Sequence, residues 1–225
     1  MFKKPPERMI GYIHDYIGED GSDYLDNYEE ISNDFTGVIS PETYVLSNLC
    51  AIITQMNTPH NLLDVGCGKG ILLKESNAKH TKVGMDISSG ELLQIEDPHV
   101  IKVRAYAEDM PFNNNIFDMV ICCNVLEHVL DAGLAAYEIN RVLRPGGFLL
   151  LACPWKQDLS VYNLSAYKER YKQYKYKHLR SIGWMDISFK WFPDYKLLSW
   201  TDIKINEKGM EFTTYPIRFM VWKKL

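Results

Sequence analysis

Three glycines at alternate positions follow a short apolar run that ends in an aspartate, in the stretch LLDVGCGKGILL from Leu62 to Leu73. Glycine lets a backbone turn sharply and lets a ligand approach it closely, so this stretch is a candidate binding loop. The spacing argues against two phosphate-binding motifs. A dinucleotide fingerprint needs its third glycine one position after Gly70, and a P-loop needs a Gly-Lys-Ser/Thr sequence, which is absent here. A simple turn that binds nothing is the remaining alternative.

The segments around this loop alternate between apolar strands and amphipathic helices. Strands are predicted at 61–65, 81–87, 99–106, 117–125 and 148–154, and helices at 41–56, 89–95 and 130–143, with a turn at 144–147. This alternation, with strands apolar on both sides, predicts a parallel sheet covered by helices on both faces. The glycine loop then follows the first strand, at the edge where an open α/β sheet binds its ligand.

The loop resembles the first motif, D-x-G-x-G-x-G, of the S-adenosylmethionine-dependent methyltransferases with the Rossmann-like (class I) fold. Four further motifs of that family follow in order: an aspartate that ends the second strand at Asp86, AEDMPF at 107–112, FDMVICCNVLEHV at 117–129 and LRPGGFLLLACP at 143–154. These motifs cover somewhat under half of the chain, and on them it is identified as a methyltransferase type 11-like member. The resemblance implies S-adenosylmethionine as cofactor and S-adenosylhomocysteine as product.

The family pattern implies a role for each matching residue around the methionine and ribose of the cofactor. Gly66 and Gly68 would lie under the methionine part, and Asp64 would face its amino group. Asp86 would accept hydrogen bonds from both ribose hydroxyls. A cap on the following helix is the structural alternative for Asp86.

The resemblance also implies the contacts of the adenine. Ile87 would pack on the ring, the Ala107 N–H would donate to a ring nitrogen, and the Asn124 carbonyl would face the methionine ammonium. Many relatives carry an aspartate just before the alanine, whereas this chain has Tyr106. Glu108 or a backbone carbonyl is therefore expected to accept from the adenine amino group.

Methyl transfer to an alcohol needs a general base, although the sulfonium methyl itself is already activated. His128, which follows the fourth predicted strand, is the favoured base because a group fixed to the sheet is placed more accurately than one on a lid. An imidazole titrates near a pH of about 6.5 and can take up a proton at neutral pH. His178 and Asp158 are the alternatives. A half-buried structural histidine at position 128 is an equally weighted interpretation.

Residues 154–192 are expected to form a lid that selects the acceptor. Apolar and aromatic side chains recur there on one helical face, at Leu164, Tyr167, Tyr171, Tyr174 and His178, and basic residues occupy the other faces. The basic residues could anchor a phosphate, a carboxylate or an anionic surface. A solvated amphipathic helix explains the pattern equally well. Aromatic and basic interleaving also suits nucleic acid, which the formal net charge of −4 disfavours.

We expect one α/β domain over residues 1–225. It comprises an N-terminal arm at 1–40, a cofactor-binding core at 41–153, the lid at 154–192 and a C-terminal helix and strands at 193–225. An antiparallel last strand would complete a seven-stranded, mostly parallel, Rossmann-like sheet with helices on both faces. The chain shows no membrane-spanning run and no signal peptide, so a cytoplasmic location is expected. The five cysteines lack C-x-x-C spacing, which favours buried thiols over disulfides or a metal site.

The function that these observations favour is transfer of a methyl group to a small-molecule, sugar or glycan-precursor acceptor, preferably at a hydroxyl. A small amine is the second acceptor class. A cofactor-binding protein without transferase activity, acting as a partner or regulator, is compatible with the same residues. A nicotinamide reductase is disfavoured by the glycine spacing. The sequence does not fix the oligomeric state.

Overall fold

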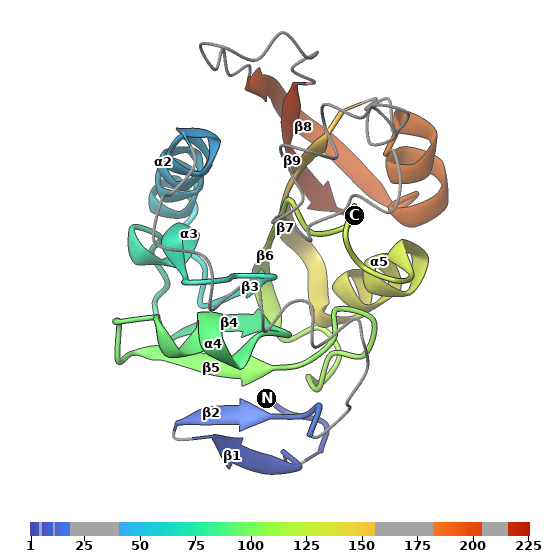
Figure 1. Ribbon diagram of the computed structural model, residues 1–225. Coiled ribbons are helices and arrows are strands. Elements are labelled where there is room, and N and C mark those ends of the chain that lie inside the picture. Colours follow the sequence, from blue (N-terminus) through green and yellow to red (C-terminus); the bar gives the residue numbers. More distant parts are fainter. Residues whose placement is uncertain (5, 11, 19–40, 156–181, 204–215) are drawn as a thin grey trace, which may run out of the picture.

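Apolar side chains on both sides of the central strands place them in the interior of one nine-stranded sheet (Figure 1). The computed structural model describes residues 1–4, 6–10, 12–18, 41–155, 182–203 and 216–225. The elements are β1 (Arg8–Ile10), β2 (Ile13–Asp15), α2 (Pro41–Met56), β3 (Asn61–Val65), α3 (Ile71–Lys74), β4 (Thr81–Asp86), α4 (Ser89–Leu93), β5 (Val100–Arg104), β6 (Phe117–Cys123), α5 (Ala132–Val142), β7 (Leu143–Pro154), the π-helical turn η2 (Asp186–Trp191), β8 (Tyr195–Ile203) and β9 (Ile217–Lys224).

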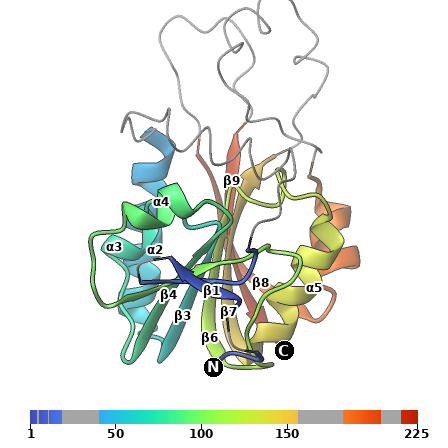
Figure 2. The same ribbon diagram turned by 60° about the horizontal axis from the view of Figure 1, so that its bottom comes forward.

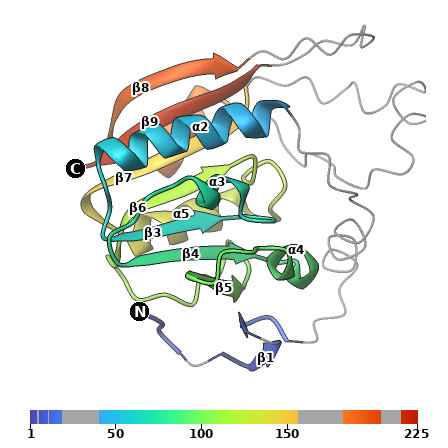
Figure 3. The ribbon, with the colours of Figure 1, turned by 90° about the vertical axis from the view of Figure 1, so that its left-hand side faces the viewer.

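The strand order of the sheet is β1-β2-β5-β4-β3-β6-β7-β9-β8. Strands β2, β5, β4, β3, β6 and β7 run parallel, whereas β9 is antiparallel to both β7 and β8. The order reverses at β3, which pairs with β4 on one side and β6 on the other. A crevice forms beyond the carboxyl ends of the strands at such a switch point, and Figure 3 shows these ends pointing to one side.

Helices cover both faces of the sheet, as predicted. Helices α2, α3 and α4 lie on one face, and α5 and η2 lie on the other (Figures 1 and 2). Each face has its own buried cluster, one containing Leu46 of α2 and Leu73 of α3, the other containing Ala135 of α5 and Ile187 of η2. Burial of apolar surface on both faces is what stabilises a largely parallel sheet.

Two features of the sheet differ from the expectation. A hairpin of two three-residue strands, β1 and β2, extends the sheet beside β5. Three residues are too few to show a period of two, so these strands could not be predicted from the sequence. The predicted turn at 144–147 lies inside β7, where Gly146 has φ of 76° and the ladder between β6 and β7 is irregular. The antiparallel final strand was predicted correctly.

Most of the predicted lid and arm lies outside the described residues. Positions 19–40 and 156–181 belong to that group, and with them Asp158, His178 and the aromatic face of the lid. The described part of the predicted lid resumes at Ile182, which forms an isolated β-bridge with Trp155, and continues into η2.

All five cysteines are free thiols, as expected, and Cys123 alone among them is only partly buried. Among the described helices, none has both the length and the apolarity needed to cross a membrane.

A buried ion pair attaches the N-terminal hairpin to the sheet. The Arg104 Nη1 lies 3.4 Å from Asp15 Oδ1, and both side chains are almost completely buried, at 5% and 0% exposed. The same guanidinium donates to the Gly18 carbonyl, and its Nε donates to the Ile87 carbonyl at 2.9 Å. Arg104 thus connects the hairpin to the segment that follows β4.

Replacing Asp15 with Asn should lower the free energy of unfolding by about 3–5 kcal/mol, because the buried Arg104 guanidinium would lose the charge of Asp15. Urea denaturation of the full chain measures this loss. The control is Lys190→Gln, which breaks the exposed pair with Asp186 and should change stability by less than about 1 kcal/mol. Equal, small losses in both variants would contradict a structural role for the buried pair.

Candidate functional site

The glycine loop after β3 is shaped by backbone angles that other residues rarely adopt. Gly66, Gly68 and Gly70 have φ of 65°, 50° and 73°. A Cβ placed on Gly66 would lie 2.4 Å from Cγ2 of Val125, in the segment that follows β6. The loop therefore needs glycine at Gly66 for two reasons, the left-handed backbone and the close approach of Val125.

Asp86 ends β4 and is held by the backbone on both sides. Its Oδ2 accepts from the Gly68 N–H at 2.8 Å, and its Oδ1 accepts from the Ser88 N–H at 3.0 Å. These two bonds fix the orientation of the carboxylate at the end of β4. The helix cap is Ser88 and not Asp86, because the Ser88 hydroxyl accepts from the Glu91 N–H.

Asp64 is a buried carboxylate with an unsatisfied oxygen. It is 2% exposed, and its Oδ2 has no hydrogen-bond partner among the described residues. Burial raises the pKa of Asp64 well above its ordinary value, and the nearby Asp86 charge raises it further. A buried acceptor without a donor is destabilising, which makes Asp64 a strong candidate to meet a ligand donor.

Asn124 presents a second unsatisfied acceptor at the end of β6. Its backbone has φ of 57°, and its N–H donates to the Ala152 carbonyl of β7 at 2.9 Å. Its side-chain Oδ1 is buried and has no partner among the described residues. The ends of β3 and β6, which are neighbouring strands, therefore both offer acceptors.

The carboxylates around the loop give the site a negative potential. Burial is the main cause that raises the pKa of Cys67, and the charges of Asp86, Asp64 and Glu91 each raise it further. Acceptors and negative charge together suit a ligand that carries donors and positive charge. S-adenosylmethionine suits these acceptors and this negative charge, since it has a sulfonium, an ammonium and two ribose hydroxyls.

The residues predicted for the adenine follow β4 and β5. Ile87 is half-buried and Ala107 is buried. Glu108 Oε1 accepts from the Asp131 N–H at 3.1 Å, just ahead of α5. Glu108 therefore already has a structural partner, and its role toward the adenine amino group stays a prediction.

An ion pair on α5 fixes the segment at 107–112. The N–H of Met110 donates to Glu138 Oε2 at 2.7 Å, and Arg141 Nη2 donates to the Met110 carbonyl at 2.9 Å. Arg141 also donates to Glu138 and to the Phe112 carbonyl. This network holds the backbone of the predicted adenine segment against the helix.

The favoured base, His128, lies in the turn that follows Asn124. Its N–H donates to the Val125 carbonyl at 2.8 Å, and the side chain is half-buried. The neighbouring Glu127 is 1% exposed. Val125, Leu126 and Val129 of this turn pack in the same core cluster as α5, so His128 is attached to a fixed part of the sheet. Its catalytic role remains a prediction.

Several residues that shape the site were not singled out from the sequence. They are Glu91, Arg104, Glu138 and Arg141. Ser88 and Glu91 follow the S-x-x-E pattern of a capping box, which could have identified the start of α4. Glu138 and Arg141 have the i, i+3 spacing of a helical ion pair, but nothing in the sequence tells which loop such a pair will hold.

Comparison with known proteins bears on the central part of the chain. A family model described as a methyltransferase domain matches residues 63–151. The ubiquinone biosynthesis O-methyltransferase of Paracidovorax citrulli is 33% identical over 103 residues, which are 40% of this chain and 42% of that protein. The malonyl-[acyl-carrier protein] O-methyltransferase of Legionella pneumophila is 33% identical over 100 residues, 41% of this chain and 35% of that protein. The chain thus spans less than half the length of these curated relatives.

The fold is also similar to solved structures. The YcgJ protein from Bacillus subtilis has a TM-score of 0.63 and is 16% identical, covering 80% of this chain and 98% of that one. At this level of identity the similarity concerns the fold alone.

The raised pKa of Asp64 predicts a linkage between pH and stability. Its folded pKa lies above the unfolded value of about 3.9, so the unliganded protein should lose stability as pH rises from that value through the folded pKa. Asp64→Asn carries no such proton, and its stability should change less over the same range. Chemical denaturation at several pH values measures the difference. Parallel pH profiles for the two proteins would contradict the assignment.

Proposed function

We propose that this chain, in which residues 63–151 form a methyltransferase domain of the S-adenosylmethionine-dependent class I family, methylates a hydroxyl group of a small-molecule, sugar or glycan-precursor acceptor. The observation that carries the proposal is the buried, unsatisfied Asp64 carboxylate beside the glycine loop. Cofactor binding would supply its missing donor. Two of the relatives above are O-methyltransferases by name, which supports oxygen as the acceptor atom.

Residues of the glycine loop and of the ends of β3, β4 and β6 are proposed to bind the methionine and ribose of the cofactor. Asp64 and Asn124 would receive the ammonium of the methionine part, with Gly66 and Gly68 below it. Asp86 would hold the ribose, with its carboxylate positioned by the N–H groups of Gly68 and Ser88.

The adenine end of the site would lie between two backbone segments. One contains Ile87, whose carbonyl is fixed by Arg104. The other contains Ala107 and Glu108 and is fixed by Glu138 and Arg141 through Met110. Rigid support of this kind keeps a bound cofactor in one orientation.

Bound S-adenosylmethionine would supply the activated methyl group, and the chain would supply position and proton removal. The acceptor must lie in line with the methyl group, with water excluded. We assign proton removal from the acceptor hydroxyl to His128, which is supported by its place in the turn after β6. His178 is the second candidate and belongs to the proposed lid at 154–192.

The first test is cofactor affinity of Asp86→Ala. Loss of up to two charge-assisted hydrogen bonds, each worth about 1.5–3 kcal/mol, should weaken S-adenosylhomocysteine binding at least about tenfold in calorimetry. Asp97→Ala is a matched control, because this carboxylate also accepts from a backbone N–H, that of His99, in a loop outside the site. Unchanged affinity in a folded Asp86→Ala protein would contradict the proposed cofactor site.

The second test concerns the base and uses a metabolite extract with deuteriomethyl-labelled cofactor, the product being detected by its mass. His128→Ala should lower turnover by a factor of about 10²–10⁴ while cofactor affinity stays nearly unchanged. A higher pH should restore part of the rate, because more of the acceptor is then deprotonated. His60→Ala, at the start of β3, is the control and should behave like the parent protein.

Near-normal turnover of His128→Ala between about pH 6 and 9 would exclude His128 as the base. An inactive His178→Ala would then move the role to the lid. Normal turnover in both variants would indicate a neutral amine acceptor, which needs no base.

A further inference from the structure

A guanidinium held between two indole rings lies at the same edge of the sheet as the proposed cofactor site. Arg218 is the second residue of β9, where it pairs in register with Cys153 of β7 and Asp202 of β8. Its Cζ lies 4.1 Å from the ring centre of Trp155 and 4.3 Å from that of Trp200. Neither ring contributed to the site described above.

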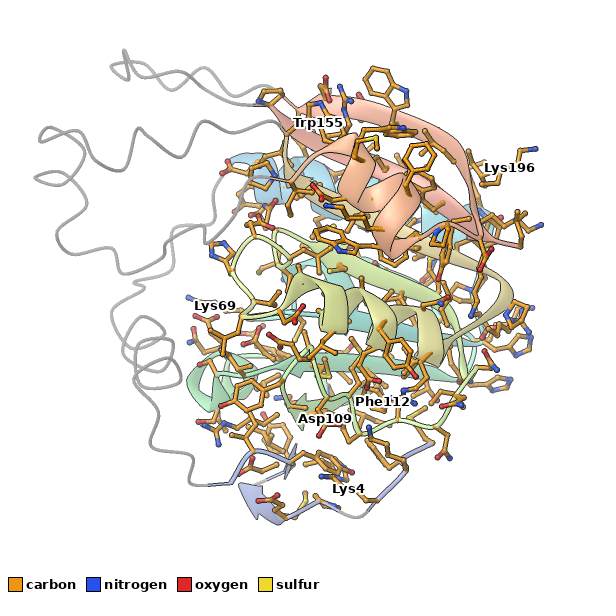
Figure 4. All side chains as sticks on the ribbon, turned by 90° about the vertical axis from the view of Figure 1, so that its right-hand side faces the viewer. Lys4, Lys69, Asp109, Phe112, Trp155 and Lys196 are labelled. Atoms are coloured by element: carbon orange, nitrogen blue, oxygen red, sulfur yellow. The ribbon has the colours of Figure 1, made fainter. Side chains whose placement is uncertain are left out.

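The position of Arg218 relative to the cofactor residues follows from the strand register. Asn124 extends β6 and binds the Ala152 carbonyl of β7, one residue before Cys153. Arg218 is therefore two strands away from Asn124 at nearly the same level, a backbone separation of about 10 Å. Figure 4 shows Lys69 of the glycine loop and Trp155 on the same side of the molecule, and Lys196 at the start of β8 on the other side.

Cys153 lies near charged groups of two elements, Glu127 in the turn after β6 and Arg218 in β9. Burial is the main cause that raises the pKa of Cys153; Glu127 raises it further, whereas Arg218 lowers it. The Cys153 thiol is therefore close both to Glu127, the neighbour of His128, and to the Arg218 guanidinium. Trp155, Cys153 and the turn residue Val125 belong to one core cluster.

Asp202 orients the guanidinium without using all its donors. Arg218 Nε donates to Asp202 Oδ1 at 2.7 Å, and Arg218 Nη2 donates to Asp202 Oδ2 at 2.9 Å. The Nη1 group has no hydrogen-bond partner in the described part of the chain. Arg141 differs, because all three of its nitrogens donate to protein oxygens. The edge of Arg218 formed by Nη1 and Nη2 remains able to bind a carboxylate or a phosphate in a bidentate manner.

The surroundings of Arg218 would strengthen an anion contact there. The side chain is 17% exposed and its Cζ lies close to both indole rings, so a ligand oxygen would meet the guanidinium with little competing water. The bidentate bond to Asp202 has already fixed the fork, which reduces the conformational entropy lost on binding.

We infer that Arg218, oriented by Asp202 and enclosed by Trp155 and Trp200, binds an anionic group of the methyl acceptor, a carboxylate or a phosphate. The claim that the bound anion belongs to a methyl acceptor rests on the proposed function. The anion site itself can be tested without turnover. It extends that function by specifying the chemical class of the acceptor.

The test uses the tryptophans beside Arg218 as reporters. Inorganic phosphate and, separately, acetate are titrated into the full chain with bound S-adenosylhomocysteine, at constant ionic strength, and the indole fluorescence is followed. The parent protein should give a saturable change with at least one of the two anions. The stronger response identifies phosphate or carboxylate as the preferred group.

The main variant is Arg218→Gln/Asp202→Asn, which removes both charges and so leaves no unpaired carboxylate. Its apparent anion affinity should fall by on the order of tenfold or more, while its thermal unfolding and S-adenosylhomocysteine affinity stay close to those of the parent. Arg144→Gln is the matched control, because Arg144, near the start of β7, forms an ion pair with Asp118 of β6. It should keep the full response. No saturable response in the parent protein, or an equal response in the double variant, would overturn the inference.

An activity measurement separates this inference from the proposed function. A metabolite extract is divided by anion exchange into retained and unretained fractions, and each is incubated with deuteriomethyl-labelled cofactor. The parent should label a compound in the retained, anionic fraction, and the double variant should label it at least about tenfold more slowly. Label only in the unretained fraction would overturn the anionic acceptor. Absence of label in both fractions, with a normal anion response, would contradict the proposed function and leave the anion site supported.

Discussion

The hydrogen bond from the Gly68 N–H to the Asp86 carboxylate is the interaction on which the rest of the site depends. It joins the glycine loop after β3 to the end of β4, and so fixes the backbone next to Asp64. The loop can approach Asp86 because Gly66 carries no side chain where Val125 packs. The switch in strand order at β3 places Asn124 on the other side of the same loop. One constraint thus assembles acceptors from β3, β4 and β6.

The arrangement is unfavourable for the unliganded protein and favourable for a cationic ligand. Asp64 is buried near Asp86, and burial followed by that charge raises its pKa. The surrounding structure supplies the stability that this cluster lacks. Arg104 and Asp15 fix the segment after β4, and Glu138 and Arg141 fix the segment after β5. A site with buried, unsatisfied acceptors on a rigidly supported backbone is well suited to bind its ligand in one orientation.

The sequence predicted those parts of the fold that depend on local pattern. The alternation of strands and helices, the antiparallel last strand and the start of α2 at Pro41 all follow from periodicity or capping. The candidate site residues Asp64, Gly66 and Asp86 could be proposed from the sequence because their spacing matches the family motifs. The hairpin of β1 and β2 could not, because three residues carry no period. Arg104 and Arg218 could not either, since their partners, Asp15 and Asp202, depend on strand order, which local patterns do not contain.

The most direct measurement of the central claim is a crystal structure of the chain with S-adenosylhomocysteine bound. The account predicts the ammonium within hydrogen-bonding distance of Asp64 or Asn124, and the ribose hydroxyls on Asp86, whose bonds to Gly68 and Ser88 are retained. It also predicts that the unsatisfied Asp64 oxygen gains a donor, directly or through one water. A ligand bound away from the carboxyl ends of β3 and β4, or an Asp64 oxygen still without a donor in the complex, would contradict it.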